Sequence, residues 1–175
     1  MAKMRFIIIA FLLISIGHNT AGQNILRENV EFTYLSQIGV RQTGNNTGPR
    51  VDAYLATTGL DPGYAWCAAF VAWVLSENNI KNPKSAWSPA WFANKYVIYS
   101  HGSRYNTNPL PGDVFGIYFS RLNRIAHVGF IHRYSEKFTV TVEGNTNDTG
   151  SRTGDGVYLK RRPTRQINKV ARYIK

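Results

Sequence analysis

The stretch Pro62-Gly63-Tyr64-Ala65-Trp66-Cys67-Ala68-Ala69-Phe70-Val71-Ala72-Trp73-Val74-Leu75 decides the fold. Its apolar run is long for a strand, and three alanines together with Leu75 favour a helix. Apolar residues on every side of that helix predict that it packs within the protein. The Pro-Gly turn places Cys67, the single cysteine of the chain, in the first helical turn. Backbone N–H groups without helical partners point past a side chain at that position.

Cys67 at a helix N-terminus has two interpretations. A free thiol has a pKa of about 8.5, and lowering it to about 6 takes roughly 3 kcal/mol of differential stabilisation. A helix N-terminus supplies about 0.3–1 kcal/mol, and about 2 kcal/mol where it is partly buried. A nucleophilic Cys67 therefore requires an imidazole or another cationic partner elsewhere in the chain. The alternative is that Cys67 is a small buried hydrophobic residue, as most free cysteines are.

Residues 1–22 have the pattern of a secretory signal peptide. Lys3 and Arg5 precede an apolar run from Phe6 to Ile16, and Thr20-Ala21-Gly22 supplies small residues for cleavage. The run is shorter than the ~20 residues that a membrane span needs, and a short anchor or a core helix is the alternative. We expect residues 23–175 to form a single exported domain, periplasmic or secreted. An unpaired cysteine in an oxidising compartment favours a reactive thiol.

The chain is strongly basic, with 21 Lys+Arg against 10 Asp+Glu and a formal charge of +11. Without Lys3 and Arg5 the charge is +9. Such an excess favours polyanionic partners, namely wall polymers, anionic lipid, lipopolysaccharide or nucleic acid, with solubility alone as the alternative. Basic residues alternate with apolar ones near the C-terminus and predict a charged edge strand there; they are Arg161, Arg162, Arg165, Lys169, Arg172 and Lys175.

Helices are expected first and strands after. Helices are predicted from Asn24 to about Gln37, from Pro49 to about Thr57, and from Cys67, with a short helix after Pro89. Alternation and turn residues then predict five strands, at Asp113–Phe119, Ile125–Tyr134, Phe138–Glu143, Val157–Arg161 and Val170–Ile174. N-terminal helices packed on a C-terminal antiparallel sheet of five or six strands make an α+β fold.

Two of these strands carry candidate partners for the thiol. His127 and His132 lie on one strand, where side-chain alternation places them on opposite faces. On the next strand Glu143 and Asn145 share a polar face, and antiparallel pairing would put Glu143 beside His127. Ordinary surface polarity is the alternative for that face. His101 lies in a polar loop and is interpreted as a solvated surface residue.

A cysteine, a histidine and a carboxylate together make a nucleophile, a base and a group that orients the base. Cys67 would attack a carbonyl carbon, and His127 would take the thiol proton and later protonate the leaving amine. Glu143 would hold the imidazole tautomer, and Asn145 would orient the ring or bind substrate. The backbone N–H of Cys67 would be an oxyanion donor.

Four blocks of the sequence resemble the CHAP family of cysteine- and histidine-dependent amidohydrolases/peptidases. They are Ala65-Trp66-Cys67-Ala68-Ala69-Phe70-Val71-Ala72-Trp73, Pro111-Gly112-Asp113-Val114, Ala126-His127-Val128-Gly129-Phe130 and Val142-Glu143-Gly144-Asn145. The resemblance covers roughly Arg41 to Pro163. It implies a papain-like fold, a site of Cys67, His127, Glu143 and Asn145, and hydrolysis of an amide in bacterial peptidoglycan. That amide either joins glycan to stem peptide or lies within the peptide or cross-bridge.

The sequence also departs from the family's pattern. Some relatives carry an aspartate-rich calcium loop before the cysteine, whereas Asp61-Pro62-Gly63 offers one carboxylate. The chain lacks the paired spacing of a zinc site and the glycine patterns of nucleotide-binding loops, so we expect no metal and no cofactor. From its length we expect no separate wall-binding module. Substrate binding then falls to the basic surface and to Trp66, Tyr64 and Trp87, with core packing as the alternative for most aromatic residues from Trp87 to Tyr99.

Several functions are compatible with these residues. We expect a monomeric wall hydrolase that binds peptidoglycan in its groove and anionic wall polymers or lipopolysaccharide on its basic surface, and no nucleic acid. A non-catalytic wall- or lipid-binding module would use the same charge and aromatic residues. The same hydrolase would otherwise serve as an exported antibacterial toxin, restrained by an immunity or inhibitor protein, or as a wall-opener for a secretion or conjugation apparatus.

Overall fold

The computed structural model describes residues 21–103, 106–149 and 154–175. The predicted signal peptide, residues 1–22, therefore lies outside the described residues except at its last two positions. Within the described ranges, no helix combines the length and the hydropathy needed to cross a membrane.

The helices come first, as the sequence predicts. Residues 21–35 are helical, and α2 (Pro49–Thr57) and α3 (Cys67–Glu77) follow. Proline opens α2, and Gly59, in the left-handed region with φ 73°, stops the chain from continuing it. Eight of the eleven residues of α3 are buried, so the predicted interior helix is confirmed. A short 3-10 helix, Ser88–Phe92, lies where a helix after Pro89 was expected.

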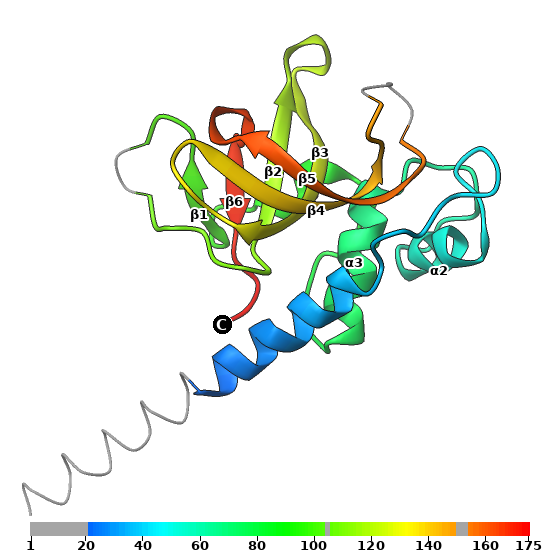
Figure 1. The fold of residues 1–175 in the computed structure, drawn as a ribbon, viewed down its shortest axis with the longest axis horizontal. Helices are drawn as coiled ribbons and strands as arrows, with labels where there is room; N and C mark the ends of the chain where they lie inside the picture. The colour runs from blue at the N-terminus through cyan, green and yellow to red at the C-terminus, as the bar shows by residue number, and fades with distance from the viewer. Residues whose placement is uncertain (1–20, 104–105, 150–153) are drawn as a thin grey trace, which may run out of the picture.

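Six antiparallel strands form one sheet in the order β1-β6-β2-β3-β4-β5. They are β1 (Val97–Ser100), β2 (Val114–Phe119), β3 (Arg124–Arg133), β4 (Phe138–Thr146), β5 (Gly156–Pro163) and β6 (Lys169–Ala171). All five predicted strands are present. Alternation misses β1, because its residues are partly buried throughout and show no two-residue period. The helices lie along one side of the sheet (Figure 1), which confirms the α+β class with a papain-like arrangement.

The expected charged edge strand is only partly correct. β6 lies inside the sheet, because β1 pairs with it on one side and β2 on the other. The edges are β1 and β5, and β5 carries Arg161 and Arg162. The prediction fails for β6 because strand order depends on the pairing with β1, which no residue pattern shows.

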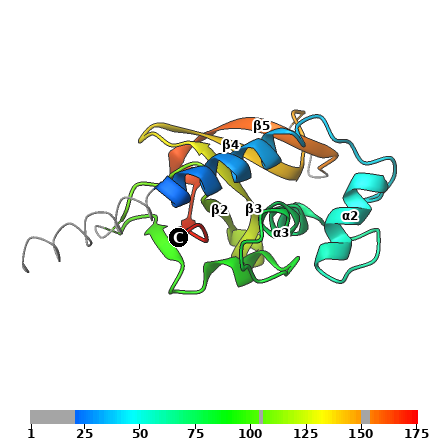
Figure 2. The ribbon, with the colours of Figure 1, turned by 90° about the horizontal axis from the view of Figure 1, so that it is seen from below.

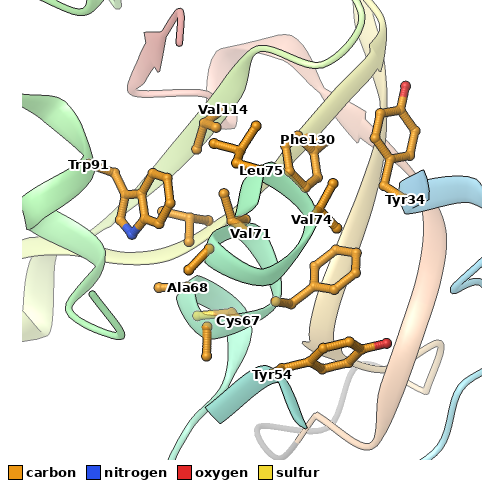
Figure 3. Close-up of a cluster of buried hydrophobic side chains, with 14 of the residues drawn as sticks. Tyr34, Tyr54, Cys67, Ala68, Val71, Val74, Leu75, Trp91, Val114 and Phe130 are labelled. Carbon is orange, nitrogen blue, oxygen red and sulfur yellow. The ribbon is translucent and has the colours of Figure 1, made fainter. Parts of the chain in front are cut away.

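The main core lies between α3 and the sheet. Figure 3 shows Val71 and Leu75 of α3 between Trp91 on one side and Phe130 on the other. The helix at residues 21–35 lies across the same side of the sheet (Figures 1 and 2), where Tyr34 stacks on Phe130 with ring centroids 5.1 Å apart. All five side chains are fully buried, and burying one of this size contributes roughly 1.5–3 kcal/mol.

The two faces of β3 meet different partners. On the face towards the helices, the His132 Nδ1 lies 3.2 Å from the Tyr34 hydroxyl. On the opposite face, the His127 ring packs against Phe115 with centroids 6.3 Å apart. Alternation along the strand therefore separates the two histidines as predicted, and only His127 faces the polar side of β4.

Candidate active site

Cys67 is the first residue of α3, directly after the N-cap residue Trp66. Its side chain is 6 % exposed, and its sulfur lies 3.8 Å from the hydroxyl oxygen of Ser88. The backbone N–H groups of a first helical turn have no carbonyl partner four residues earlier, so they remain available beside the sulfur. Cys67 thus combines a helix N-terminus with a polar neighbour, which a purely structural core cysteine does not need.

The imidazole of His127 is bonded to the carboxylate of Glu143. The His127 Nε2 lies 2.8 Å from the Glu143 Oε2. On the paired strands, Phe130 lies opposite Val142, which makes His127 and Glu143 diagonal neighbours on one face. The contact that alternation predicts is therefore present. Because Nε2 is engaged by the carboxylate, Nδ1 is the ring nitrogen left to face the thiol.

Glu143 is fully buried, and a guanidinium compensates its charge. Arg162 of β5 donates from Nε to Oε1 and from Nη2 to Oε2, each at 2.5 Å, and the Thr141 hydroxyl also donates to Oε1. Gly129 leaves the room for this group, since a methyl there would lie 3.1 Å from the Glu143 Cγ. Paired N–H donors of this kind hold a carboxylate in a defined orientation, here aimed at the imidazole.

Sequence reasoning missed Arg162 and Thr141 as members of the site. In the sequence, Arg162 is one of a run of basic residues. In the register of β4 and β5, Arg162 lies opposite Thr139 and Glu143 lies opposite Tyr158, so the Arg162 side chain reaches along the same face of the sheet to the carboxylate. Alternation along β5 is the signal that places Arg162 on the Glu143 face, but it identifies a pair only once the register is known.

The three groups shift one another's pKa values. Burial raises the pKa of the Cys67 thiol, but hydrogen bonding and the charge of His127, with smaller effects from Ser88 and the Val128 backbone, bring it below its usual value. Burial lowers the pKa of His127, but Cys67 and Glu143 raise it to about 9. Burial raises the pKa of Glu143, but Arg162 and His127 hold it well below its usual range. The three shifts therefore favour the thiolate, the imidazolium and the carboxylate, whose charges stabilise one another.

Asn145 holds the backbone ahead of Cys67 and not the imidazole, which corrects its predicted role in orienting the ring. Its Oδ1 accepts the Trp66 N–H at 3.2 Å. Its Nδ2 donates to the Asn46 Oδ1 at 3.2 Å and to the Gly154 carbonyl at 3.3 Å. Asn145 does line a cavity beside His127. Its amide therefore positions the segment that leads into the nucleophile.

Three adjoining cavities form a groove over the site. The central cavity, of about 330 Å³, is lined by both Cys67 and His127. The Trp87 cavity, of about 490 Å³, shares Cys67 with the central cavity and is lined further by Leu60, Tyr64, Lys84, Trp87, Ser88 and Arg124. The Arg165 cavity, of about 1000 Å³, shares His127 with the central cavity and is lined further by Phe119, Arg121, Leu122, Arg162 and Arg165. The sulfur and the imidazole therefore lie at the middle of an open groove.

Two of the three predicted substrate contacts line this groove. Tyr64 and Trp87 are 56 % and 54 % exposed at the Trp87 cavity, where the Arg124 guanidinium lies 4.2 Å above the Trp87 ring centroid. The prediction for Trp66 is wrong, because its side chain is fully buried. Its Nε1 donates to the Gln42 Oε1 at 3.3 Å, which fixes the indole below the groove.

The arrangement suits nucleophilic attack on a carbonyl carbon. It supplies an ionised sulfur, an acid for the leaving group and backbone donors beside the sulfur. In the described part of the chain, no group of three or more His, Cys, Asp or Glu side chains is placed to hold a metal ion.

In a comparison with known families, the model of the CHAP domain matches residues 59–145. No curated protein and no solved structure matches the chain significantly. The matched segment includes Cys67, His127 and Glu143 and ends at Asn145, whereas Arg162 lies beyond it. The CHAP domain is an amidase/peptidase-type module of peptidoglycan hydrolases. Through this segment, the chain belongs to the CHAP-domain family.

Proposed function

We propose that the protein is an exported cysteine hydrolase that cleaves an amide bond in bacterial peptidoglycan. The bond is that of an N-acetylmuramoyl-L-alanine amidase or of a stem or cross-bridge endopeptidase. The observation that carries the proposal is the imidazole of His127 lying between a thiol of lowered pKa and a carboxylate 2.8 Å from its Nε2. A binding module does not require a thiol, an imidazole and a carboxylate in contact at the middle of a groove.

The reaction follows from the positions of these groups. The Cys67 thiolate attacks the carbonyl carbon, and the oxyanion that forms faces the N–H groups at the start of α3. The C–N bond breaks as the imidazolium gives its Nδ1 proton to the leaving amine, and a thioester remains. Water then attacks the thioester with the neutral imidazole as base, which releases a carboxylic acid and restores the thiol. Glu143 remains ionised throughout and stabilises the imidazolium.

The basic charge of the chain supports a wall polymer as the partner. Without Lys3 and Arg5 the formal charge is +9, which attracts polyanions over a range of about 10 Å at moderate salt. The signal-peptide pattern of residues 1–22 supports export to the compartment where that polymer lies. Whether the wall belongs to the producing cell or to a competitor decides between a housekeeping enzyme and a toxin with an immunity protein.

Digestion of purified sacculi tests the proposal. The wild-type chain is expected to release soluble muropeptides with new amines and carboxylates, identified by mass spectrometry, which also shows the bond that is cut. Cys67→Ala and His127→Ala should release none while keeping the wild-type circular dichroism spectrum. Full release by Cys67→Ala, or no release by the wild type, would overturn the proposed cysteine hydrolase.

A further inference from the structure

The groove has a defined direction, because Cys67 and His127 line different ends of it. Cys67 lines the central and Trp87 cavities but not the Arg165 cavity. His127 lines the central and Arg165 cavities but not the Trp87 cavity. A general acid must lie beside the nitrogen that it protonates. The acyl part of a substrate therefore lies towards the Trp87 cavity, and the amine part towards the Arg165 cavity.

The Arg165 cavity carries positive charge that no described lining residue compensates with a free carboxylate. Arg121 and Arg165 line it, and neither has a hydrogen bond, ion pair or ring contact with any described residue. Arg162, also in the lining, is paired with Glu143. No Asp or Glu is among the described residues that line this cavity. The two exposed guanidinium groups are thus left to bind an anion beside the imidazole.

In the Trp87 cavity, the Arg124 guanidinium already has partners within the protein. The Arg124 side chain lies over the Trp87 ring and donates from Nη1 to the Ile125 carbonyl at 3.2 Å. Lys84, whose ammonium is a compact point charge, is the other cation there. Since a guanidinium presents a planar fork that matches a carboxylate, the Arg165 cavity is the better carboxylate site of the two.

We propose that the Arg165 cavity binds a free carboxylate of the leaving amine fragment, through Arg121 and Arg165. The inference rests on the proposed function and narrows its substrate to amides whose amine side carries a carboxylate close to the scissile bond. Phe119 and Leu122, 45 % and 54 % exposed, line the same cavity and accept the aliphatic part of that fragment. Peptidoglycan stem peptides supply both features.

Kinetics on paired substrates test the assignment. Soluble muropeptides are used either with free carboxylates or after carbodiimide-coupled amidation with ammonia. Arg121→Ala/Arg165→Ala is expected to raise KM roughly fivefold on the free-carboxylate substrate, the effect of about 1 kcal/mol for an exposed charged contact, with kcat unchanged. On the amidated substrate, the wild type should already show the higher KM, and the double substitution should add nothing.

Two further variants make the result decisive. Arg133→Ala, which removes an exposed positive charge at the far end of β3, is the control and should leave both substrates unaffected. Equal losses on free and amidated substrates, or an amidation-dependent loss in Lys84→Ala instead, would overturn the assignment. A wild-type chain that releases no product would overturn the proposed function and this inference with it. Turnover that is insensitive to amidation would overturn only the inference.

A readout without turnover completes the test. The full-length Cys67→Ala chain should bind the purified amine product in calorimetry, and the same chain with Arg121→Ala/Arg165→Ala should bind it roughly fivefold more weakly. Binding of the amidated product should be the same in both chains. Loss of affinity for the amidated product as well would show a general effect of charge and not a carboxylate contact.

Discussion

Burial and contacts with neighbouring charges shift the pKa of each residue of the site in opposite directions. The Cys67 thiol is 6 % exposed, and burial alone would keep it protonated. The neighbouring His127 imidazolium is the main group that lowers the thiol pKa against the effect of burial, and Glu143 favours the charged form of that imidazole. Arg162 in turn keeps the buried carboxylate ionised. The reactivity of the sulfur therefore depends on a chain of charges that reaches from α3 to β5.

The pH dependence of thiol alkylation checks this dependence on His127. In the wild type, iodoacetamide should label Cys67 rapidly at neutral pH, because the thiol pKa is lowered. In His127→Ala, burial is left to raise the thiol pKa, and labelling at pH 7 should fall about tenfold for each unit that the pKa rises. His132→Ala, on the opposite face of β3, serves as the control. Equal labelling of His127→Ala and the wild type at pH 7 would contradict the ion pair.

The ionisation of His127, the partner of Cys67, also determines how activity falls at high pH. The pKa of His127 is raised to about 9, so the imidazolium is present below that pH and is lost above it. The profile of kcat/KM against pH should therefore rise as Cys67 ionises, below the usual range of a thiol, and fall near pH 9.

At the scale of the elements, the site requires α3 to lie very close to β4. A methyl group added at Gly144 would lie 2.8 Å from the Phe70 Cβ and 2.8 Å from the Trp66 Cζ3. Such distances are shorter than real carbon contacts, so any side chain at this position pushes the helix away from the strand. Glycine at 144 therefore sets the separation between the nucleophile on α3 and the carboxylate on β4.

Gly144→Ala tests that separation. The substitution should destabilise the protein by roughly 1–3 kcal/mol, the usual cost of overpacking a core, measured by urea unfolding. It should also lower kcat, because the displaced helix carries Cys67. Lys81→Ala, at an exposed position after α3, is the control. Wild-type stability together with wild-type kcat would show that Phe70 and Trp66 accommodate the added methyl group without displacing Cys67.

The elements were the most predictable part of the structure. Apolar runs, prolines and two-residue alternation identify α2, α3 and five of the six strands. Alternation also predicts the contact between Glu143 and His127, because both residues lie in regular strands. It fails at Asn145, whose φ of 53° is left-handed and where the register of β4 and β5 shifts. It cannot identify Arg162, because ion pairing across strands depends on register and not on the composition of one strand.

At the scale of the whole molecule, one buried carboxylate ties the two ends of the described chain to the sheet. Asp113 is fully buried and lies directly before β2. Arg27 of the N-terminal helix donates to its Oδ1 at 3.2 Å, and Arg172, which follows β6, donates to its Oδ2 at 2.7 Å. The Leu110 N–H also donates to Oδ2, at 2.9 Å. The Pro-Gly-Asp block is therefore a structural junction.

Asp113→Asn should loosen that junction. The neutral amide leaves two guanidinium groups without a carboxylate, and we expect a loss of about 3 kcal/mol in the free energy of unfolding. Hydrogen exchange should increase first in residues 21–35, because Arg27 anchors that helix. Glu136→Gln, at an exposed position in the β3–β4 turn, is the control. Unchanged protection of residues 21–35 would mean that the core packing of Val30 and Tyr34 secures the helix without the ion pair.

The guanidinium on the outermost strand has a practical consequence for anyone who trims this protein to a minimal module. A fragment that stops at residue 145, the last position of the family match, would keep the sulfur, the ring and the acid. It would lack Arg162, so the Glu143 carboxylate would lose the cation that compensates its charge. The pKa of a buried carboxyl group without such a partner rises, and Glu143 would take up a proton. Such a fragment would have the family's signature residues and no working centre, so cuts should fall after β6, which holds its place inside the sheet.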